Sequence, residues 1–319
     1  MIMSEIGGYF GLEPLVGNEY HKGLIALNTA RNALLYILKV RKIRKLFIPY
    51  FLCDSVSRLC KREGFSYEYY EVDYEFLPRL AKRLNKDEYI YVVNYYGQLD
   101  NDCLLNIAEE YHGNIIVDNV QAFFQRPIDG IDTIYSCRKF FGVSDGAYLS
   151  TSCSLNEDLK TDASSKRMKH LLGRFETNTA SVFYSDFKSN EESFDGLELM
   201  NMSKLTHNLL GAIDYKKIRI ARERNFGVLH EFLSNQNRLH INIPMAPYAY
   251  PFYCENGIAV RKMLSKKNIY IPTLWPNVFC LKDEIAKDYS KNILPLPCDQ
   301  RYTSTDMQYV VSEVLQCIS

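Results

Sequence analysis

The chain has 319 residues, of which 47% are hydrophobic and 24% are charged. This length can bury a large core, and we expect one large domain with a smaller one. Lysine plus arginine equals aspartate plus glutamate at 38 each, so no overall field attracts nucleic acid or an anionic membrane, and neither is expected as a partner.

Strand-like and helix-like segments alternate through the first half of the chain. We predict helices over 30–40, 54–63, 76–84 and 102–111, and strands over 46–50, 67–72, 89–94, 114–118, 132–136 and 146–151. Strands separated by amphipathic helices are typical of right-handed crossovers. The pattern therefore predicts an α/β fold with a mainly parallel large sheet.

The second half of the chain predicts a different arrangement. A polar stretch over 152–168 is typical of a loop or a helix start, and a long helical pattern covers 203–234. We expect a large domain over 1–234, which includes this helix, and a smaller α+β domain over 235–319. Capping residues from Ser304 onward predict a helix at the end of the chain.

Cysteine and histidine spacing argues against two kinds of site. The nine cysteines form no Cys-x-x-Cys pair, and the six histidines show no metal-ligand spacing. We therefore expect reduced thiols, no disulfide framework and no metal. Met1–Glu5 has no basic segment before an apolar one, and no apolar run approaches the ~18 residues of a membrane span, so we expect a cytoplasmic protein.

The first candidate site residues stand at the start of the helix over 30–40. Asn28 or Thr29 is expected to cap this helix, which leaves the amides of Thr29, Ala30 and Arg31 free to bind an anion. A helix start of this kind is suited to a phosphate group.

Two later strands present polar side chains at their carboxyl ends, where open α/β sheets bind ligands. Asp118 ends the strand over 114–118 and precedes Gln121, and Ser136 ends the next strand, three residues before Lys139. Taken singly, a strand-terminal Asp is more often a helix cap, and a lysine after a strand is usually a solvated charge. Their order and spacing together favour a site for pyridoxal phosphate.

Each of these residue types meets one need of that cofactor. The carboxylate of Asp118 would keep the pyridine nitrogen protonated, which makes the ring an electron sink. Lys139 would form the Schiff base and later move a proton, so its free amine must be weakly basic. Gln121 would hydrogen-bond the ring hydroxyl, and Ser136 would donate to the phosphate.

With these motifs the chain resembles the DegT/DnrJ/StrS aminotransferases nearly from end to end. The resemblance is carried by Thr29-Ala30-Arg31, Ile48-Pro49-Tyr50-Phe51-Leu52-Cys53, Asn94-Tyr95-Tyr96-Gly97, the segment from Asp118 to Gln121, the segment from Ser136 to Lys139, and Asp145-Gly146-Ala147. It implies the three-layer α/β/α scaffold of fold type I, with pyridoxal phosphate as cofactor. It also implies a homodimer that transfers an amino group, usually from glutamate, to a nucleotide-linked keto sugar in surface polysaccharide biosynthesis.

The chain departs from the family in several ways. It is shorter than typical members, and its serine lies three residues before the lysine, where many members have five. Cys53 stands where many members stack an aromatic ring on the cofactor, so Phe51, Tyr95 or Tyr96 is expected to supply that face. Arg138, directly before the lysine, is unusual, and we expect it to bind a phosphate or a substrate carboxylate.

Further residues are weaker candidates for the substrate site. Tyr250 and Trp275 lie in Pro-rich aromatic segments that would form a pocket wall, although ordinary core packing explains them equally well. Arg222 and Arg224 on the long helix could meet a substrate anion. As helix residues, they are expected to be solvated instead.

Two other functions remain open from the sequence. The segments 94–97 and 138–142 also resemble the class V pattern of the cysteine desulfurases, in which a histidine takes the place of Arg138. A non-catalytic protein of the same fold, which binds a ligand or partner in polysaccharide assembly, is compatible with the short chain and with Cys53. The retained Lys139 argues against this second alternative.

Overall fold

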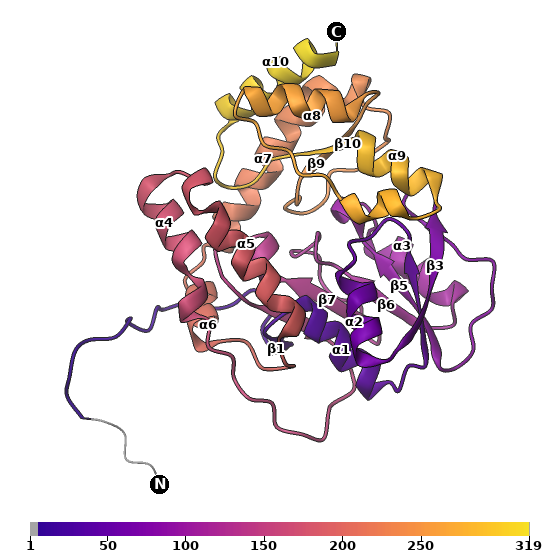
Figure 1. Ribbon diagram of the computed structural model, residues 1–319, viewed down its shortest axis with the longest axis vertical. Coiled ribbons are helices and arrows are strands. Elements are labelled where there is room, and N and C mark those ends of the chain that lie inside the picture. The colour runs from indigo at the N-terminus through magenta and orange to yellow at the C-terminus, as the bar shows by residue number, and fades with distance from the viewer. Residues whose placement is uncertain (1–5, 319) are drawn as a thin grey trace.

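The computed structural model describes residues 6–318 and contains a large sheet and a small one (Figure 1). The large sheet consists of β1 (Ile25–Leu27), β2 (Lys45–Pro49), β3 (Ser66–Val72), β4 (Pro78–Arg79), β5 (Glu88–Val93), β6 (Ile115–Asp118), β7 (Asp132–Ser136) and β8 (Ala147–Ser150). Their order is β1-β8-β7-β6-β5-β2-β3-β4. The pairs β3–β2, β2–β5, β5–β6 and β6–β7 are parallel, which confirms the predicted mainly parallel sheet.

Three helices connect strands of the large sheet: α1 (Ala30–Val40), α2 (Ser55–Glu63) and α3 (Asn101–Glu110). Thr29 caps α1, because its hydroxyl accepts a hydrogen bond from the Asn32 amide at 3.0 Å. All residues of α1 from Asn32 to Leu38 are buried, and the helix packs on β7 and β8. This packing fixes the start of α1 beside the carboxyl end of β7.

The predicted helix over 76–84 is wrong. Phe76 has a left-handed backbone with φ of 64°, and the Asp73 carboxylate accepts hydrogen bonds from the amides of Glu75 and Leu77, both at 2.9 Å. The chain therefore turns tightly and pairs β4 antiparallel with β3. Local side-chain hydrogen bonds of this kind compete with helix formation.

The predicted long helix over 203–234 is two helices, α6 (Lys204–Gly211) and α7 (Tyr215–Leu233). Ser203 caps α6, and Asp214 caps α7 by accepting from the Lys217 amide at 2.9 Å. Because a residue that caps a helix start has a non-helical backbone, Asp214 interrupts the predicted helix.

The C-terminal part of the chain has its own core above the large sheet (Figure 1). The strands β9 (Tyr250–Tyr253) and β10 (Ile293–Leu296) pair antiparallel, and α7, α8 (Gly257–Lys266) and α10 (Ser304–Ile318) contribute to this core. The helix predicted from Ser304 is therefore confirmed. The division of the chain at residue 234 stays a prediction.

The remaining helices are peripheral or short. They are α4 (Lys169–Thr177), α5 (Tyr184–Ser193), α9 (Glu284–Asn292) and the 3-10 turns η1 (Tyr95–Gly97), η2 (Cys137–Lys139), η3 (Ser165–Arg167), η4 (Ser181–Phe183), η5 (Phe194–Gly196), η6 (Ser234–Gln236) and η7 (Pro276–Cys280). The helices α4 and α5 pack against each other at the side of the molecule, and α5 leads into η5 (Figure 1).

Arg222 is buried, and the prediction that it is solvated is wrong. Only 2% of the residue is exposed, and its guanidinium donates to the Gln300 side chain and to the Pro247 carbonyl, both at 2.8 Å. It also lies over the ring of Phe140. Arg222 therefore stabilises packing between distant segments, whereas Arg224 is exposed as expected.

The segment Met1–Glu5, on which the expectation of a cytoplasmic protein partly rests, lies outside the described residues. In the part of the chain from residue 6 to 318, no helix is both long and apolar enough to cross a membrane, and no group of three or more His, Cys, Asp or Glu side chains could hold a metal ion. All nine cysteines are free.

Candidate functional site

A cavity of about 280 Å³ lies where the carboxyl ends of β6 and β7 meet the start of α1. The predicted residues that line it are Thr29, Ala30, Arg31, Cys53, Asp118, Gln121, Ser136, Arg138, Lys139 and Trp275. These residues come from segments that are far apart in the sequence. The volume is close to the lower end of small-molecule sites, about 300 Å³.

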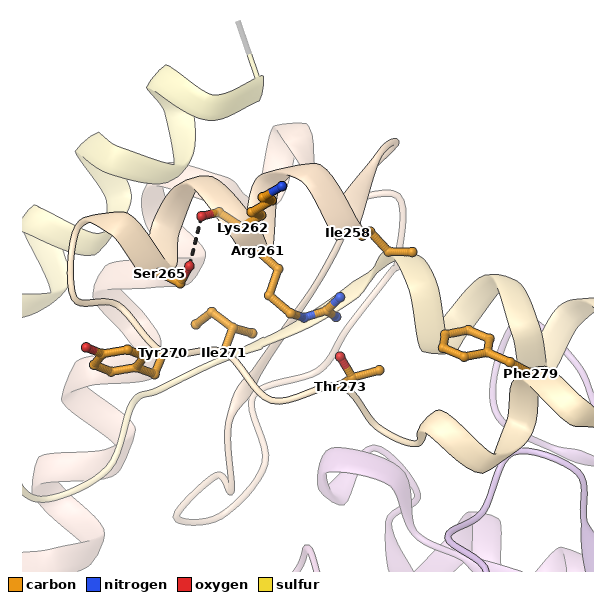
Figure 2. Close-up of a pocket in the computed structure, with 8 residues that line it drawn as sticks. All are labelled: Ile258, Arg261, Lys262, Ser265, Tyr270, Ile271, Thr273 and Phe279. Atoms are coloured by element: carbon orange, nitrogen blue, oxygen red, sulfur yellow. Dashed lines mark hydrogen bonds between the residues drawn. The ribbon is translucent and has the colours of Figure 1, made fainter. Parts of the chain in front are cut away.

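A second hollow, of about 440 Å³, is an open groove between α8 and the segment before η7 (Figure 2). It is lined by Ile258, Arg261, Lys262, Ser265, Tyr270, Ile271, Thr273 and Phe279. Although this groove is larger, it contains none of the predicted site residues. We therefore take the smaller cavity as the candidate site.

The start of α1 forms the anion-binding end of the cavity. Because Ala30 and Arg31 belong to the first helical turn, their amides have no acceptor within the helix. The positive end of the helix dipole points in the same direction. Ser136, at the end of β7, adds a hydroxyl to the lining.

Asp118 is a buried carboxylate at the end of β6. The Tyr91 hydroxyl donates to Asp118 Oδ2 at 2.7 Å, and the Val120 amide donates to Oδ1 at 2.9 Å. Burial raises the pKa of the carboxyl group to about 6, although these two hydrogen bonds and the charge of Lys139 act in the opposite direction. Asp118 is therefore held in place by hydrogen bonds, and it is ionised at neutral pH.

Lys139 ends the turn η2, directly after β7, and its side chain is accessible from the cavity. Desolvation of the amine within the cavity lowers its pKa, and the charge of Arg138 lowers this pKa further. The amine is therefore less basic than that of an ordinary lysine, which suits a group that must act as a nucleophile and a base.

Gln121 and Cys53 both line the cavity. The Gln121 Oε1 accepts from the Tyr96 amide at 2.8 Å, which leaves its Nε2 group available to donate. The Cys53 sulfur lies 2.7 Å from the Ser55 hydroxyl, at the start of α2.

The structure does not bring Tyr95 or Tyr250 to the cavity. Tyr95 is buried and stacks on Phe51 at 5.2 Å between ring centroids, so both rings belong to the core behind the site, as does Tyr96. Tyr250 packs in the C-terminal core against Phe226. The aromatic lining comes from other residues, since Tyr91, Phe194, Tyr248 and Trp275 line the cavity.

Sequence reasoning did not identify Tyr91, Glu191 or Phe194 as site residues. Tyr248 belongs to the aromatic segment over 248–253, for which a pocket wall was one of the two expected roles, and it does line the cavity. Tyr91 lies inside a strand, and its contact with Asp118 depends on the pairing of β5 with β6. Glu191 and Phe194 lie in a segment with no strong apolar period, so no sequence signal marks them.

Replacing Asp118 with asparagine is expected to stabilise the protein above about pH 6 when no pyridoxal phosphate is added. In the unfolded chain this carboxyl ionises near its ordinary pKa of 3.8, whereas in the folded protein it keeps its proton up to about 6. The native state therefore binds more protons in this window, and stability falls as pH rises through it. The difference corresponds to roughly 3 kcal/mol.

Urea unfolding of the wild type and of Asp118→Asn across this pH window checks this expectation. The unfolding free energy of the variant should rise relative to the wild type between about pH 4 and pH 7 and then stay level. Two pH profiles that run parallel would contradict the raised pKa of Asp118.

Three solved structures have a similar architecture. A DegT DnrJ EryC1 StrS aminotransferase from Brucella abortus aligns with a TM-score of 0.65 and 15% identity, over 93% of this chain and 86% of that chain. DesI, solved in the presence of its TDP-sugar product, gives 0.64 and 13%, over 92% and 80%. NtdA from Bacillus subtilis, solved with bound PMP, gives 0.62 and 14%, over 92% and 73%.

The chain has the fold of these three proteins. The predicted α/β fold of the pyridoxal-phosphate transferases is thus confirmed. No family model and no curated protein matches the sequence. At these low identities the similarity establishes the fold, and the activity must be argued from the residues of the cavity.

Proposed function

We propose that this protein is a pyridoxal-phosphate-dependent aminotransferase. The proposal is supported chiefly by one observation: Lys139, Asp118 and the start of α1 line a single cavity at the carboxyl ends of parallel strands. Ligands of open α/β sheets bind at this edge. The similar fold of a solved DegT DnrJ EryC1 StrS aminotransferase adds to this support.

The donor groups around the cavity fit this cofactor. The free amides of Ala30 and Arg31 and the Ser136 hydroxyl would hold its phosphate. The Asp118 carboxylate would pair with the protonated pyridine nitrogen, and the free Nε2 of Gln121 would donate to the ring hydroxyl. All of these groups line the cavity.

When bound, pyridoxal phosphate supplies an electron sink that weakens bonds to the α carbon of an amino acid. Lys139 would attach the cofactor, and its amine would be freed when the amino group of the donor takes its place on the cofactor. The freed amine would then take a proton from the donor α carbon and deliver it to the cofactor carbon that Lys139 had held. Its lowered pKa makes the free amine available for this transfer. Asp118 would keep a negative charge beside the ring nitrogen, and Leu274 and Trp275 would cover the substrate.

We further propose glutamate as the amino donor and a nucleotide-linked keto sugar as the acceptor. The structure of DesI, solved in the presence of its TDP-sugar product, supports a substrate of this class. A homodimeric assembly, a place in the cytoplasm and a role in surface polysaccharide biosynthesis are parts of the same proposal. Cysteine desulfuration and a non-catalytic binding role are the competing hypotheses.

Addition of glutamate to the protein loaded with pyridoxal phosphate tests this function. The absorption band at ~400–430 nm should disappear as an equimolar amount of α-ketoglutarate forms. The Lys139→Ala variant, treated in the same way, serves as the control. Release of sulfide or alanine from cysteine would instead favour the desulfurase alternative, and the absence of any reaction with amino acids would contradict the aminotransferase proposal.

A further inference from the structure

Two arginine side chains line the cavity, and one segment of chain supplies an acidic partner to each. Glu191, near the end of α5, forms an ion pair with Arg138. Asp195, in the turn η5, forms an ion pair with Arg31 at 3.1 Å between Nη1 and Oδ1. Because Glu191 and Asp195 are four residues apart in a helical segment, they present two carboxylates on the same side.

The ring of Phe194 contacts both guanidinium groups. The Cζ atom of Arg138 lies 4.0 Å from the ring centroid, and that of Arg31 lies 5.9 Å from it. Phe194 is itself buried and lines the cavity. An aromatic face at this distance orients a guanidinium group. Phe194 can therefore hold Arg138 in place independently of Glu191.

The two acidic residues differ in how firmly they are held. Asp195 Oδ2 forms a second ion pair with Arg58 at 2.9 Å, and its carbonyl oxygen accepts from Arg62. Within the described residues, the ion pair with Arg138 is the one polar contact of the Glu191 side chain, and its Oε1 atom has no hydrogen bond of acceptable geometry. Glu191 can therefore separate from Arg138 at a smaller cost than Asp195 from its partners.

We propose that Arg138 is a ligand of the cofactor phosphate, and that Glu191 competes with this phosphate for Arg138. This inference rests on the proposed function. A phosphate monoester carries about −1.5 to −2 charges at neutral pH and forms bidentate hydrogen bonds with a guanidinium group. Neither the amides at the start of α1 nor the Ser136 hydroxyl supplies a full positive charge. Arg138 would supply one.

The surroundings of Arg138 place it at the phosphate end of the cavity. Its neighbour Arg31 belongs to the first turn of α1, and the guanidinium groups of both residues lie over the ring of Phe194. Burial and the charge of Arg31 lower the pKa of Arg138 to about 9. An anion that lies between the two guanidinium groups reduces the repulsion between them. This end of the cavity therefore favours the binding of a phosphate group.

The test compares the affinities of the full-length protein for pyridoxal phosphate and for pyridoxal, which lacks the phosphate. Glu191→Gln is expected to lower the Kd for pyridoxal phosphate by about threefold to tenfold, because a neutral side chain competes less for Arg138. Its Kd for pyridoxal should not change. Glu192→Gln is the matched control, since Glu192 is exposed and pairs with Lys188 outside the cavity.

Arg138→Gln is expected to raise the Kd for pyridoxal phosphate by about tenfold to a hundredfold relative to the Kd for pyridoxal, a ratio in which any effect of Arg138 on Lys139 cancels because both ligands attach there. In this background, the further change Glu191→Gln should no longer affect the affinity, because its effect acts through Arg138. If Arg138→Gln does not fold, the comparison of Glu191→Gln with Glu192→Gln decides the question alone.

Three results would overturn the inference. Two concern Glu191→Gln: an unchanged affinity for pyridoxal phosphate, and an equal change in affinity for both ligands. The third is an Arg138→Gln variant that binds pyridoxal phosphate normally but has a raised KM for glutamate, which would make Arg138 a carboxylate ligand. Failure of the proposed function is distinguishable, because the protein would then bind pyridoxal phosphate without covalent attachment at Lys139.

Discussion

Replacing Lys139 with alanine is expected to abolish amino transfer, with a loss of at least about 10⁴-fold in turnover. The amine would be both the attachment point of the cofactor and the base that moves the substrate proton, so no neighbouring group replaces it. The side chain is accessible from the cavity and is not part of the core. The variant should therefore unfold at nearly the wild-type temperature.

The measurement is turnover with glutamate and a keto acceptor, together with thermal unfolding of each protein. Lys166→Ala is a suitable control, because Lys166 is an exposed lysine outside the cavity. This control should retain full activity. A Lys139→Ala variant with turnover within tenfold of the wild type would show that the chemistry does not pass through this lysine.

Asp118→Asn is expected to reduce turnover by about 10²- to 10³-fold while the cofactor still binds. An amide cannot keep the pyridine nitrogen protonated, so the ring loses much of its ability to withdraw electrons. The same substitution is expected to increase stability above about pH 6, because it removes the cost of a buried charge. The buried carboxylate would thus be retained for function at a cost in stability.

Tyr91→Phe is the matched control for this effect, because it removes one hydrogen bond to Asp118 and keeps the carboxylate. Its turnover should fall far less than that of Asp118→Asn. Turnover and the Kd for pyridoxal phosphate are measured for both variants. Near-normal turnover of Asp118→Asn with bound cofactor would remove Asp118 from the proposed mechanism.

The sheet and most residues that line the cavity could be predicted because their signals are local. A buried parallel strand is a short apolar run, and Asp118 and Ser136 end two such runs. The start of α1 carries its own capping residue, Thr29. The carboxyl ends of parallel strands meet at one edge of the sheet. These local signals were therefore sufficient to predict that residues distant in the sequence line one cavity.

The contacts that hold Asp118 and Arg138 in place could not be predicted, because they join segments that are distant in the sequence. Val93 on β5 pairs with Asp118 on β6, and this register brings the Tyr91 hydroxyl to the carboxylate. Glu191 reaches Arg138 from a largely exposed helix, where burial imposes no apolar pattern. Neither contact has a sequence signal of its own.

The errors in the helices have a different origin. The apolar spacing around 76–84 and across 203–234 is compatible with helices, but Asp73 and Asp214 use their side chains to bond nearby amides and turn the chain. Such residues are recognisable in a sequence as candidates for turns and caps. Asp214 is such a residue, and it stands at the boundary between α6 and α7.

The central claim is that pyridoxal phosphate is attached to Lys139. Borohydride reduction of the protein loaded with pyridoxal phosphate, followed by proteolysis and mass spectrometry, measures this attachment directly. We predict one modified peptide that contains Lys139, and no such modification in Lys139→Ala. A label on another lysine, or no label on a protein that binds the cofactor, would contradict the account.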